Sequence, residues 1–164
     1  MSSAFNTYYQ SPIGLIEVTG TLDSITSLFF IDKDLSFSPE SNDYLEICKT
    51  QLDEYFRGIR IDFDLKLKFE GTEFQKKVWN ELLKIPYGET KSYLWQSKKL
   101  GDPMAIRAVA KANGENKIPI IIPCHRVIAS NGSLTGYAGG LWRKKWLLDH
   151  EKKYSGKAVD LSLF

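Results

Sequence analysis

The amino-acid sequence predicts two domains. Residues 1–68 are expected to form an α/β N-terminal domain with a small antiparallel sheet and a helix, and residues 69–164 a mostly α C-terminal domain with a winged-helix-like helix-turn-helix. Short β-prone runs between turn residues fill the first part of the 164-residue chain, whereas helical apolar periodicity with capping residues fills the second. The charge changes at the same place: residues 1–70 carry 6 Lys/Arg and 12 Asp/Glu, and residues 71–164 carry 16 and 8.

Several short strands and one helix are expected in the N-terminal domain. Ser-Pro, Thr-Gly and Asp-Ser pairs divide residues 5–31 into short antiparallel strands. A helix over residues 44–56 follows from apolar residues at helical spacing, with Gly58 as its C-cap: Tyr44, Ile47, Cys48, Leu52, Tyr55 and Phe56. Cys48 lies on this stripe and is interpreted as a core residue. Strict alternation over residues 61–69 predicts a half-buried strand, and the whole domain is expected to be structural.

The C-terminal domain is expected to begin with a helix capped by Thr72 and Gln75, which fit a capping box. Its apolar stripe is formed by Phe74, Val78, Leu82 and Ile85. A second helix is predicted from Ser92 to Leu100, closed by Gly101. A third is predicted to start at Asp102 as N-cap with Pro103 in its first turn, and to end at Gly114. The two helices that flank LGDP form a candidate helix-turn-helix.

The third helix has two different faces in this interpretation. Ile106, Val109 and Ala110 are predicted to face inward, and the opposite face carries Met104, Arg107, Ala108 and Lys111. Small and basic residues together allow a helix to approach DNA closely, and Arg107 is placed to enter a groove. The alternative is an exposed amphipathic helix on a solvated, lysine-rich surface.

The segment IIPCHRVI places Cys124 next to His125 after an apolar run that contains two prolines. Residues 118–123 are interpreted as a buried extended segment, and the glycines after Cys124 allow the chain to turn and close a pocket. A neighbouring histidine can lower the pKa of a thiol. Adjacent residues on an extended segment point to opposite sides, so a Cys–His contact requires a local turn or a bridging water. Without further evidence, the adjacency can also be incidental.

Composition excludes several other functions. With only Cys48, Cys124, His125 and His150, and no CxxC or HxxxH pair, neither a disulfide framework nor a zinc site is expected. No signal peptide and no apolar run of membrane-spanning length is visible. The chain is expected to be soluble and intracellular.

A family resemblance adds to this interpretation. PCHRVI, preceded by Asn116 and followed by GYAGG and LLDHE, resembles the O6-alkylguanine-DNA alkyltransferases, the methylated-DNA–protein-cysteine methyltransferases. Upstream, GTEFQKKVWNELLKIPYGETKSY and GDPMAIRAVAKANGEN are similar to segments of that family in the same order. The close resemblance covers roughly residues 70–151.

The resemblance implies a role for each matching residue. Cys124 would take the alkyl group from O6-alkylguanine, and from O4-alkylthymine, once and irreversibly. His125 would accept the thiol proton through a water, and Glu151 would orient His125. Tyr93 would give a proton to the leaving guanine, and Asn116 would tie the cysteine loop to the helix-turn-helix. Contacts with DNA would come from Arg107, which fills the gap left by the flipped nucleotide, and from Met104, Ala108 and Lys111. The guanine pocket would be lined by Pro119, Val127, Tyr137, Ala138 and Gly139.

The expected partner is double-stranded DNA carrying O6-alkylguanine, bound by a monomer without cofactor, metal or membrane, in the cytoplasm or at the nucleoid, or in a nucleus. Three alternatives remain open from the sequence. They are a non-catalytic protein of the same fold that binds alkylated DNA, a Cys–His hydrolase, and a helix-turn-helix regulator. The first would carry another residue in place of Cys124, the second would need an oxyanion hole, and the third should prefer particular sequences.

Overall fold

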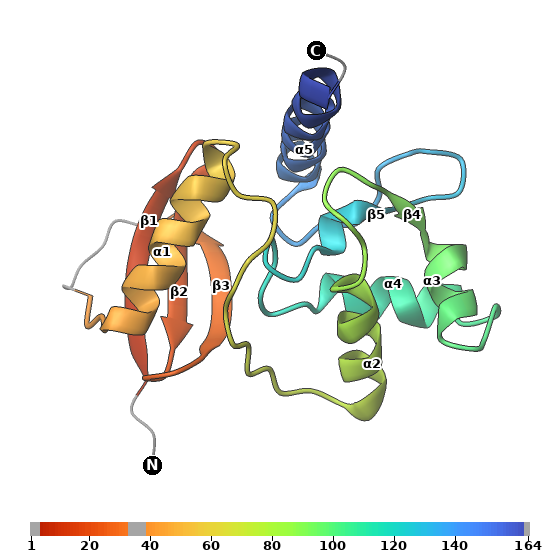
Figure 1. The fold of residues 1–164 in the computed structure, drawn as a ribbon. Helices are drawn as coiled ribbons and strands as arrows, with labels where there is room; N and C mark the ends of the chain where they lie inside the picture. Colours follow the sequence, from red (N-terminus) through yellow and green to blue (C-terminus); the bar gives the residue numbers. More distant parts are fainter. Residues whose placement is uncertain (1–3, 33–38, 163–164) are drawn as a thin grey trace. The chain divides into compact units, whose positions relative to one another are not determined.

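The computed structural model of the protein describes residues 4–32 and 39–162, with side chains as far as Ser155. The chain forms two compact units, which divide between Phe69 and Glu70. Unit 1 contains a sheet and a helix, and unit 2 is mainly helical (Figure 1).

Unit 1 is built on a three-stranded antiparallel sheet, as predicted. Strands β1 (Phe5–Ser11), β2 (Gly14–Gly20) and β3 (Ile25–Ile31) follow one another in the order β1-β2-β3. Alternate residues of the central strand β2 are buried, including Ile16 and Val18. This two-residue period places one face of the sheet against the core.

Helix α1 (Asp43–Phe56) lies across that sheet (Figure 1) and supplies the other half of the core. Asn42 caps its start by accepting a hydrogen bond from the Leu45 amide at 2.9 Å. Cys48 is fully buried on the inner face, as expected for a core residue, whereas Ile47 on the predicted stripe is about half exposed. Gly58 follows the helix with a φ of 78°, a conformation in which glycine is preferred.

The strand predicted over residues 61–69 is not formed. The segment is extended and its apolar side chains are half-buried in alternation, but it pairs with the sheet only through one parallel bridge between Leu67 and Ile25. Side chains of α1 bind its backbone instead: Gln51 exchanges two hydrogen bonds with Asp64, and the Tyr44 hydroxyl accepts from the Lys66 amide. The alternation of apolar residues over 61–69 predicted the burial correctly, but it could not identify the hydrogen-bond partners of the backbone.

Unit 2 begins with helix α2 (Glu73–Leu82), whose predicted capping box between Thr72 and Gln75 is present. Helix α3 (Tyr93–Lys99) is capped by Ser92, and helix α4 (Ile106–Gly114) follows it. Two buried contacts fix α4. Trp79 on α2 donates to the Ala112 carbonyl at 2.8 Å, and Gln96 on α3 exchanges two amide hydrogen bonds with Asn113 at 2.8 and 3.0 Å.

The predicted start of the third helix is wrong by three residues, because the N-cap is Ala105 and not Asp102. The Asp102 carboxylate accepts from the Met104 amide, and its carbonyl accepts from the Ala105 amide, so Asp102 closes a turn before the helix. The helix starts only at Ile106, which is 39% exposed and does not face inward as predicted. Val109 is buried as expected, and the rest of the inner face consists of Ala112 and Asn113.

The remaining elements of unit 2 are a short parallel ladder, one turn of 3₁₀ helix and a long helix. Strand β4 (Lys91–Ser92) pairs with β5 (Val127–Ile128), and the 3₁₀ turn η1 (Cys124–Arg126) comes directly before β5. Helix α5 (Leu141–Ser162) ends the described chain. Because β4 leads into α3 and η1 leads into β5, this pairing places Tyr93 near the cysteine segment.

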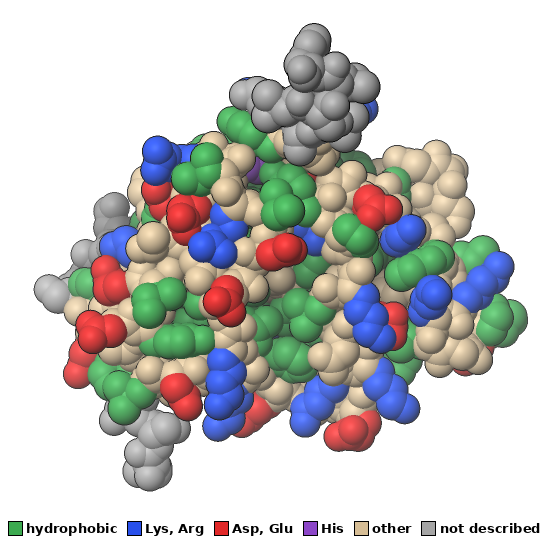
Figure 2. Space-filling model, viewed as in Figure 1, with side chains coloured by type: hydrophobic (Ala, Val, Ile, Leu, Met, Phe, Trp, Pro, Cys, Tyr) green, Lys and Arg blue, Asp and Glu red, His purple; other side chains and the backbone are tan. Residues whose placement is uncertain are grey.

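Surface charge follows the division of the sequence. On the face shown in Figure 2, acidic side chains gather over unit 1, and lysine and arginine side chains gather over the helices of unit 2. Among the residues that the structure describes, no helix is long and apolar enough to cross a membrane.

Candidate active site

Cys124 is positioned by a strained turn rather than by the predicted extended segment. Residues 118–122 close on themselves, with the Ile122 amide donating to the Ile118 carbonyl at 2.9 Å and Ile120 at a φ of 75°. Such a φ is unfavourable for a β-branched residue and requires support from its surroundings. Asn116 supplies part of that support, because its side chain accepts from the Ile118 amide and donates to the Ile122 carbonyl at 2.9 and 2.8 Å.

The 3₁₀ turn η1 provides the local turn that a Cys–His arrangement requires. It directs the His125 side chain to the buried Glu151 of α5, with His125 Nε2 2.7 Å from Glu151 Oε2. His125 is 0% and Glu151 1% exposed. The second ring nitrogen, Nδ1, is buried and has no hydrogen-bond partner among the described residues. A nitrogen of this kind can accept a proton from a nearby group.

Glu151 is an ionised carboxylate in this site. Burial alone would raise the pKa of its carboxyl, but His125, through its hydrogen bond and the charge it can carry, and the charged Arg126 bring that pKa well below its usual range. Arg126 makes a two-point contact with the carboxylate, at 2.8 Å to Oε1 and 3.1 Å to Oε2. The Gly88 amide adds a weaker hydrogen bond to Oε1 at 3.3 Å.

The Cys124 thiol is buried, with 8% exposure, and burial raises its pKa. A hydrogen bond from Asn116 and the charge of Lys144 act in the opposite direction without overcoming the effect of burial. A neighbouring histidine can lower the pKa of a thiol, but burial has the larger effect here. The resting group is a neutral thiol, which must lose its proton before it can act as a nucleophile.

Lys144 of α5 is a fully buried lysine beside this thiol. Its ammonium group donates to the Val127 and Thr135 carbonyls at 2.7 and 2.8 Å. Burial lowers the pKa of Lys144 to about 8, although Cys124, when ionised, acts to raise it. Tyr93 donates to the same Thr135 carbonyl at 3.1 Å, so both side chains bind the loop that contains Thr135.

The residues predicted to line a guanine pocket differ in how deeply they are buried. Pro119 and Val127 are buried, Tyr137 and Gly139 are half-buried, and Ala138 is exposed. The Tyr137 hydroxyl is buried without a partner among the described residues. Burial raises its pKa well above the usual value, and Cys124, when ionised, acts in the same direction. It is therefore a neutral hydroxyl that can donate or accept a hydrogen bond.

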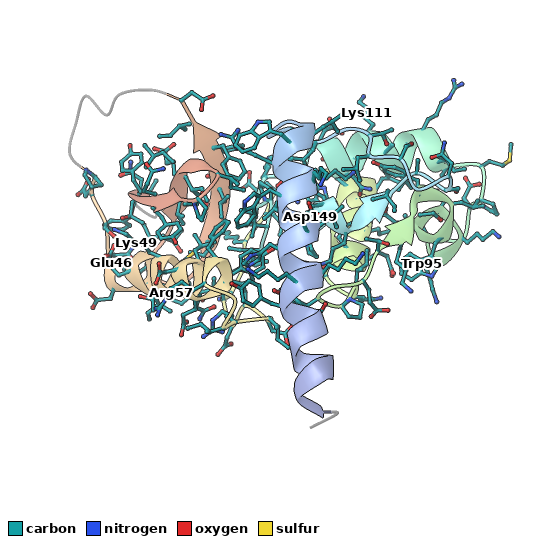
Figure 3. The ribbon with its side chains drawn as sticks, turned by 90° about the horizontal axis from the view of Figure 1, so that it is seen from above. Glu46, Lys49, Arg57, Trp95, Lys111 and Asp149 are labelled. Atoms are coloured by element: carbon teal, nitrogen blue, oxygen red, sulfur yellow. The ribbon has the colours of Figure 1, made fainter. Side chains whose placement is uncertain are left out.

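The predicted DNA-facing residues share one exposed surface of the helix-turn-helix. Arg107, Ala108 and Lys111 lie on the outer side of α4, and Met104, in the turn before it, is 90% exposed. Figure 3 shows Lys111 pointing away from the body of unit 2. An exposed methionine, a small residue and two cations together form a surface suited to a DNA groove.

Two buried cations were not identified as site residues from the sequence. Arg126 is part of the PCHRVI motif, and its position next to His125 was a usable signal. Lys144 had no such signal, because it is one of several basic residues at the start of α5 and only the fold shows that it is buried. Within residues 4–32 and 39–162, no three His, Cys, Asp or Glu side chains are grouped so that they could hold a metal ion.

Comparison with known proteins assigns both units of the chain to one family. Residues 73–153 match the model of the 6-O-methylguanine DNA methyltransferase DNA binding domain, and residues 5–69 match that of the ribonuclease-like domain of the same proteins. The chain therefore belongs to the 6-O-methylguanine DNA methyltransferase family.

Particular relatives are similar over nearly the whole chain. The methylated-DNA–protein-cysteine methyltransferase of Mycolicibacterium paratuberculosis is 43% identical over 157 residues, which cover 92% of this chain and 94% of the relative. The crystal structure of Mycobacterium tuberculosis O6-methylguanine methyltransferase superimposes with a TM-score of 0.85 at 41% identity, covering 93% of this chain and 94% of that one. A structure of the M. tuberculosis OGT protein in complex with DNA gives a TM-score of 0.82 at 42% identity, covering 90% and 92%. The family assignment argues against the two alternatives of a Cys–His hydrolase and a helix-turn-helix regulator.

Proposed function

We propose that this protein repairs alkylated DNA by a single, irreversible transfer of an alkyl group from O6 of guanine to Cys124. O4-alkylthymine is a second substrate by the same chemistry. The observation that carries the proposal is the placement of Cys124 and His125 in one 3₁₀ turn, with His125 held by the buried Glu151. The names of the relatives support the same reaction.

The reaction balances as follows. The Cys124 sulfur attacks the alkyl carbon, so that an S–C bond forms while the bond between that carbon and O6 breaks. The thiol proton passes through a water to His125 Nδ1, the nitrogen that faces away from Glu151. The leaving guanine receives a proton from Tyr93, whose hydroxyl lies at the neighbouring loop, and Tyr93 regains one from solvent. The products are a thioether and an ordinary guanine, and the protein is consumed.

A raised thiol pKa is consistent with this sequence of events. The neutral thiol is protected from unspecific alkylation until a lesion occupies the pocket. Proton transfer to His125 then generates the thiolate at the moment of attack, and the positive charge of Lys144 stabilises it. General base catalysis of this kind contributes about 10²–10⁴-fold to a rate.

Double-stranded DNA is the proposed partner, bound through the exposed face of α4. The alkyl group of a lesion lies within the base stack, so the nucleotide must rotate out of the helix to reach a buried sulfur. Arg107 would occupy the vacated space, and Ala108 would permit close approach in the minor groove. The DNA complex of the M. tuberculosis relative supports this partner. We also propose that the protein acts as a monomer without metal or cofactor, in the cytoplasm, at the nucleoid or in a nucleus.

The proposal is tested by titrating the protein with a duplex that contains one radiolabelled O6-methylguanine. Repair is expected to stop at one methyl group per protein. Cys124→Ala is expected to abolish repair and retain binding to the damaged duplex, whereas Cys48→Ala should behave as wild type, because Cys48 is buried in unit 1. Continued turnover, or repair by Cys124→Ala, would contradict the proposal.

A further inference from the structure

Arg126 follows His125 in the sequence and also contacts Glu151, the carboxylate that holds His125. Its guanidinium is buried, contacts both oxygens of Glu151, and donates to the Ile85 carbonyl at 2.6 Å. It also lies over the Tyr87 ring, 5.7 Å from the centroid. The Ile85 and Tyr87 contacts fix the guanidinium in position, so the arginine can act on the carboxylate from a defined place.

The hydrogen bonds to Glu151 determine which nitrogen of His125 carries the proton. Oε1 receives Arg126 Nε–H and the Gly88 amide, and Oε2 receives a second arginine N–H and lies 2.7 Å from His125 Nε2. An ionised carboxylate accepts hydrogen bonds and cannot donate, so Nε2 must bear a hydrogen. In the neutral ring Nδ1 then holds the lone pair that a proton acceptor needs.

Charge is the second consequence of this contact. A buried carboxylate paired only with a histidine would favour the doubly protonated, positive form of that histidine. A histidine in that form has no lone pair left and cannot accept the proton of Cys124. The guanidinium of Arg126 is always charged and balances the charge of the carboxylate. Glu151 therefore stabilises the positive form of His125 less than an unpaired carboxylate would.

Other titratable groups face this cluster from each neighbouring element. Tyr87, from the segment after α2, has a pKa raised to about 12 by burial and the charge of Glu151, so it stays neutral at ordinary pH. Tyr154 on α5 also acts to raise the pKa of Tyr87. Tyr137 and Lys144 interact with the Cys124 thiol. Of these groups only Lys144 carries a positive charge as Arg126 does. Its hydrogen bonds go to the carbonyls of Val127 and Thr135 and not to Glu151.

We propose that Arg126 is a positioning residue that keeps His125 neutral, with its proton on Nε2, so that Nδ1 can accept the proton of Cys124. This inference rests on the proposed alkyl transfer and adds to it a reason why an arginine follows the Cys-His pair. A residue that merely packed the core at this point would leave the protonation of His125 unchanged.

Nuclear magnetic resonance of the ¹⁵N-labelled imidazoles tests the inference without an activity assay. The protein has only two histidines, so His150→Gln assigns the signals. In wild type at pH 7 we expect the neutral His125 ring with hydrogen on Nε2. In Arg126→Gln the pH at which His125 takes up its second proton should rise by about one unit or more, the size expected when an opposite charge loses its counter-ion at this distance.

Single-turnover alkyl transfer is measured on the same samples. The acid limb of the rate profile should move to higher pH in Arg126→Gln by the same amount as the His125 titration, and the rate should recover at high pH to within a few-fold of wild type. Arg126→Lys keeps the charge but loses the two-point contact and should give a smaller shift. If Arg126→Gln does not fold, Arg126→Lys carries the test. Arg60→Gln is the matched control, because Arg60 pairs with Glu54 in unit 1 and should change neither curve.

The outcomes separate the two proposals. An unchanged His125 titration, with a rate reduced equally at every pH, would overturn the role of Arg126 and leave the alkyl transfer intact. A wild-type His125 that is already positive at pH 7, or that carries its hydrogen on Nδ1, would also overturn it. Failure of wild type to transfer an alkyl group would instead contradict the proposed function, while the NMR titration would still report on Arg126.

Discussion

His125 Nε2 and Glu151 Oε2 lie 2.7 Å apart in a fully buried pair that joins the 3₁₀ turn η1 to helix α5. The pair links the cysteine segment to the final helix, 26 residues later in the chain. On an exposed helix a glutamate at this position would be solvated and unimportant. Here it determines how the histidine next to the thiol is oriented.

Glu151→Gln is expected to slow alkyl transfer by at least about 10-fold, a part of what general base catalysis contributes. The amide cannot balance a proton arriving at His125, although its shape is almost unchanged. Single-turnover rates with O6-methylguanine duplex measure the effect, and Asp149→Asn, an exposed carboxylate on the same helix, is the control. A rate within two-fold of wild type would exclude a role for Glu151 in the relay.

Glu151 also predicts the behaviour of the protein in acid. The folded-state pKa of its carboxyl is depressed, so its contribution to stability is present above the unfolded pKa of about 4.5 and is lost as the pH falls toward the folded value. Urea unfolding of wild type should therefore show a loss of stability on acidification below this pH. Glu151→Gln should be less stable at pH 7 and show a shallower loss, and an equal slope for both proteins would contradict the assignment.

Lys144→Met is expected to raise the pH at which Cys124 ionises, because the ammonium charge lowers the pKa of the thiol. The thiol can be followed by its pH-dependent reaction with iodoacetamide. The neighbouring Lys145, exposed and paired with Asp149, provides the matched variant Lys145→Met, which should leave the titration unchanged. Interference from the second thiol is small, since burial raises the pKa of Cys48 to about 12.

Arg107→Ala is expected to reduce repair of duplex DNA by about 10–100-fold, because the cost of an extruded base is a few kcal/mol and the arginine offsets part of it. Reaction with free O6-benzylguanine needs no flipping and should change less than about 3-fold. Lys111→Ala removes a cation from the same face and should weaken binding to all duplexes alike, more strongly at low salt. Equal losses for Arg107→Ala on duplex and free base would contradict the flipping role.

The buried amide pair of Gln96 and Asn113 predicts a stability pattern for the helix-turn-helix. Gln96→Leu leaves the Asn113 amide buried without its partner and should cost about 1–3 kcal/mol. The double change Gln96→Leu with Asn113→Leu removes both polar groups and should cost less than the sum of the single changes. Denaturant unfolding of the four proteins gives the coupling, and strict additivity would show that the pair contributes nothing as a pair.

Much of the fold could be predicted from local patterns. The strands over residues 5–31, the helix capped at its end by Gly58 and the capping box at Thr72 are encoded within a few neighbouring residues, and these predictions were confirmed. The errors occur where the local structure depends on hydrogen bonds that the sequence pattern does not specify. Residues 61–69 bond to side chains of α1 instead of a strand, and Asp102 closes a turn before α4 rather than starting the helix.

The chemistry divides in the same way. The PCHRVI motif placed Cys124 and His125, but the strained turn at Ile120, the two-point contact of Arg126 and the burial of Lys144 depend on how η1, β5 and α5 pack. Burial raises the pKa of Cys124, which no local pattern in the sequence indicated, whereas transfer of its proton to His125 through a water was already implied by the family resemblance.

The most direct measurement is the mass of the peptide that contains Cys124 after incubation of the protein with excess O6-methylguanine duplex. The account predicts the addition of one methyl group to this peptide, none to the peptide that contains Cys48, and no addition to either peptide after incubation with undamaged DNA. An unmodified Cys124 after prolonged incubation, or a methyl group on another residue, would contradict it.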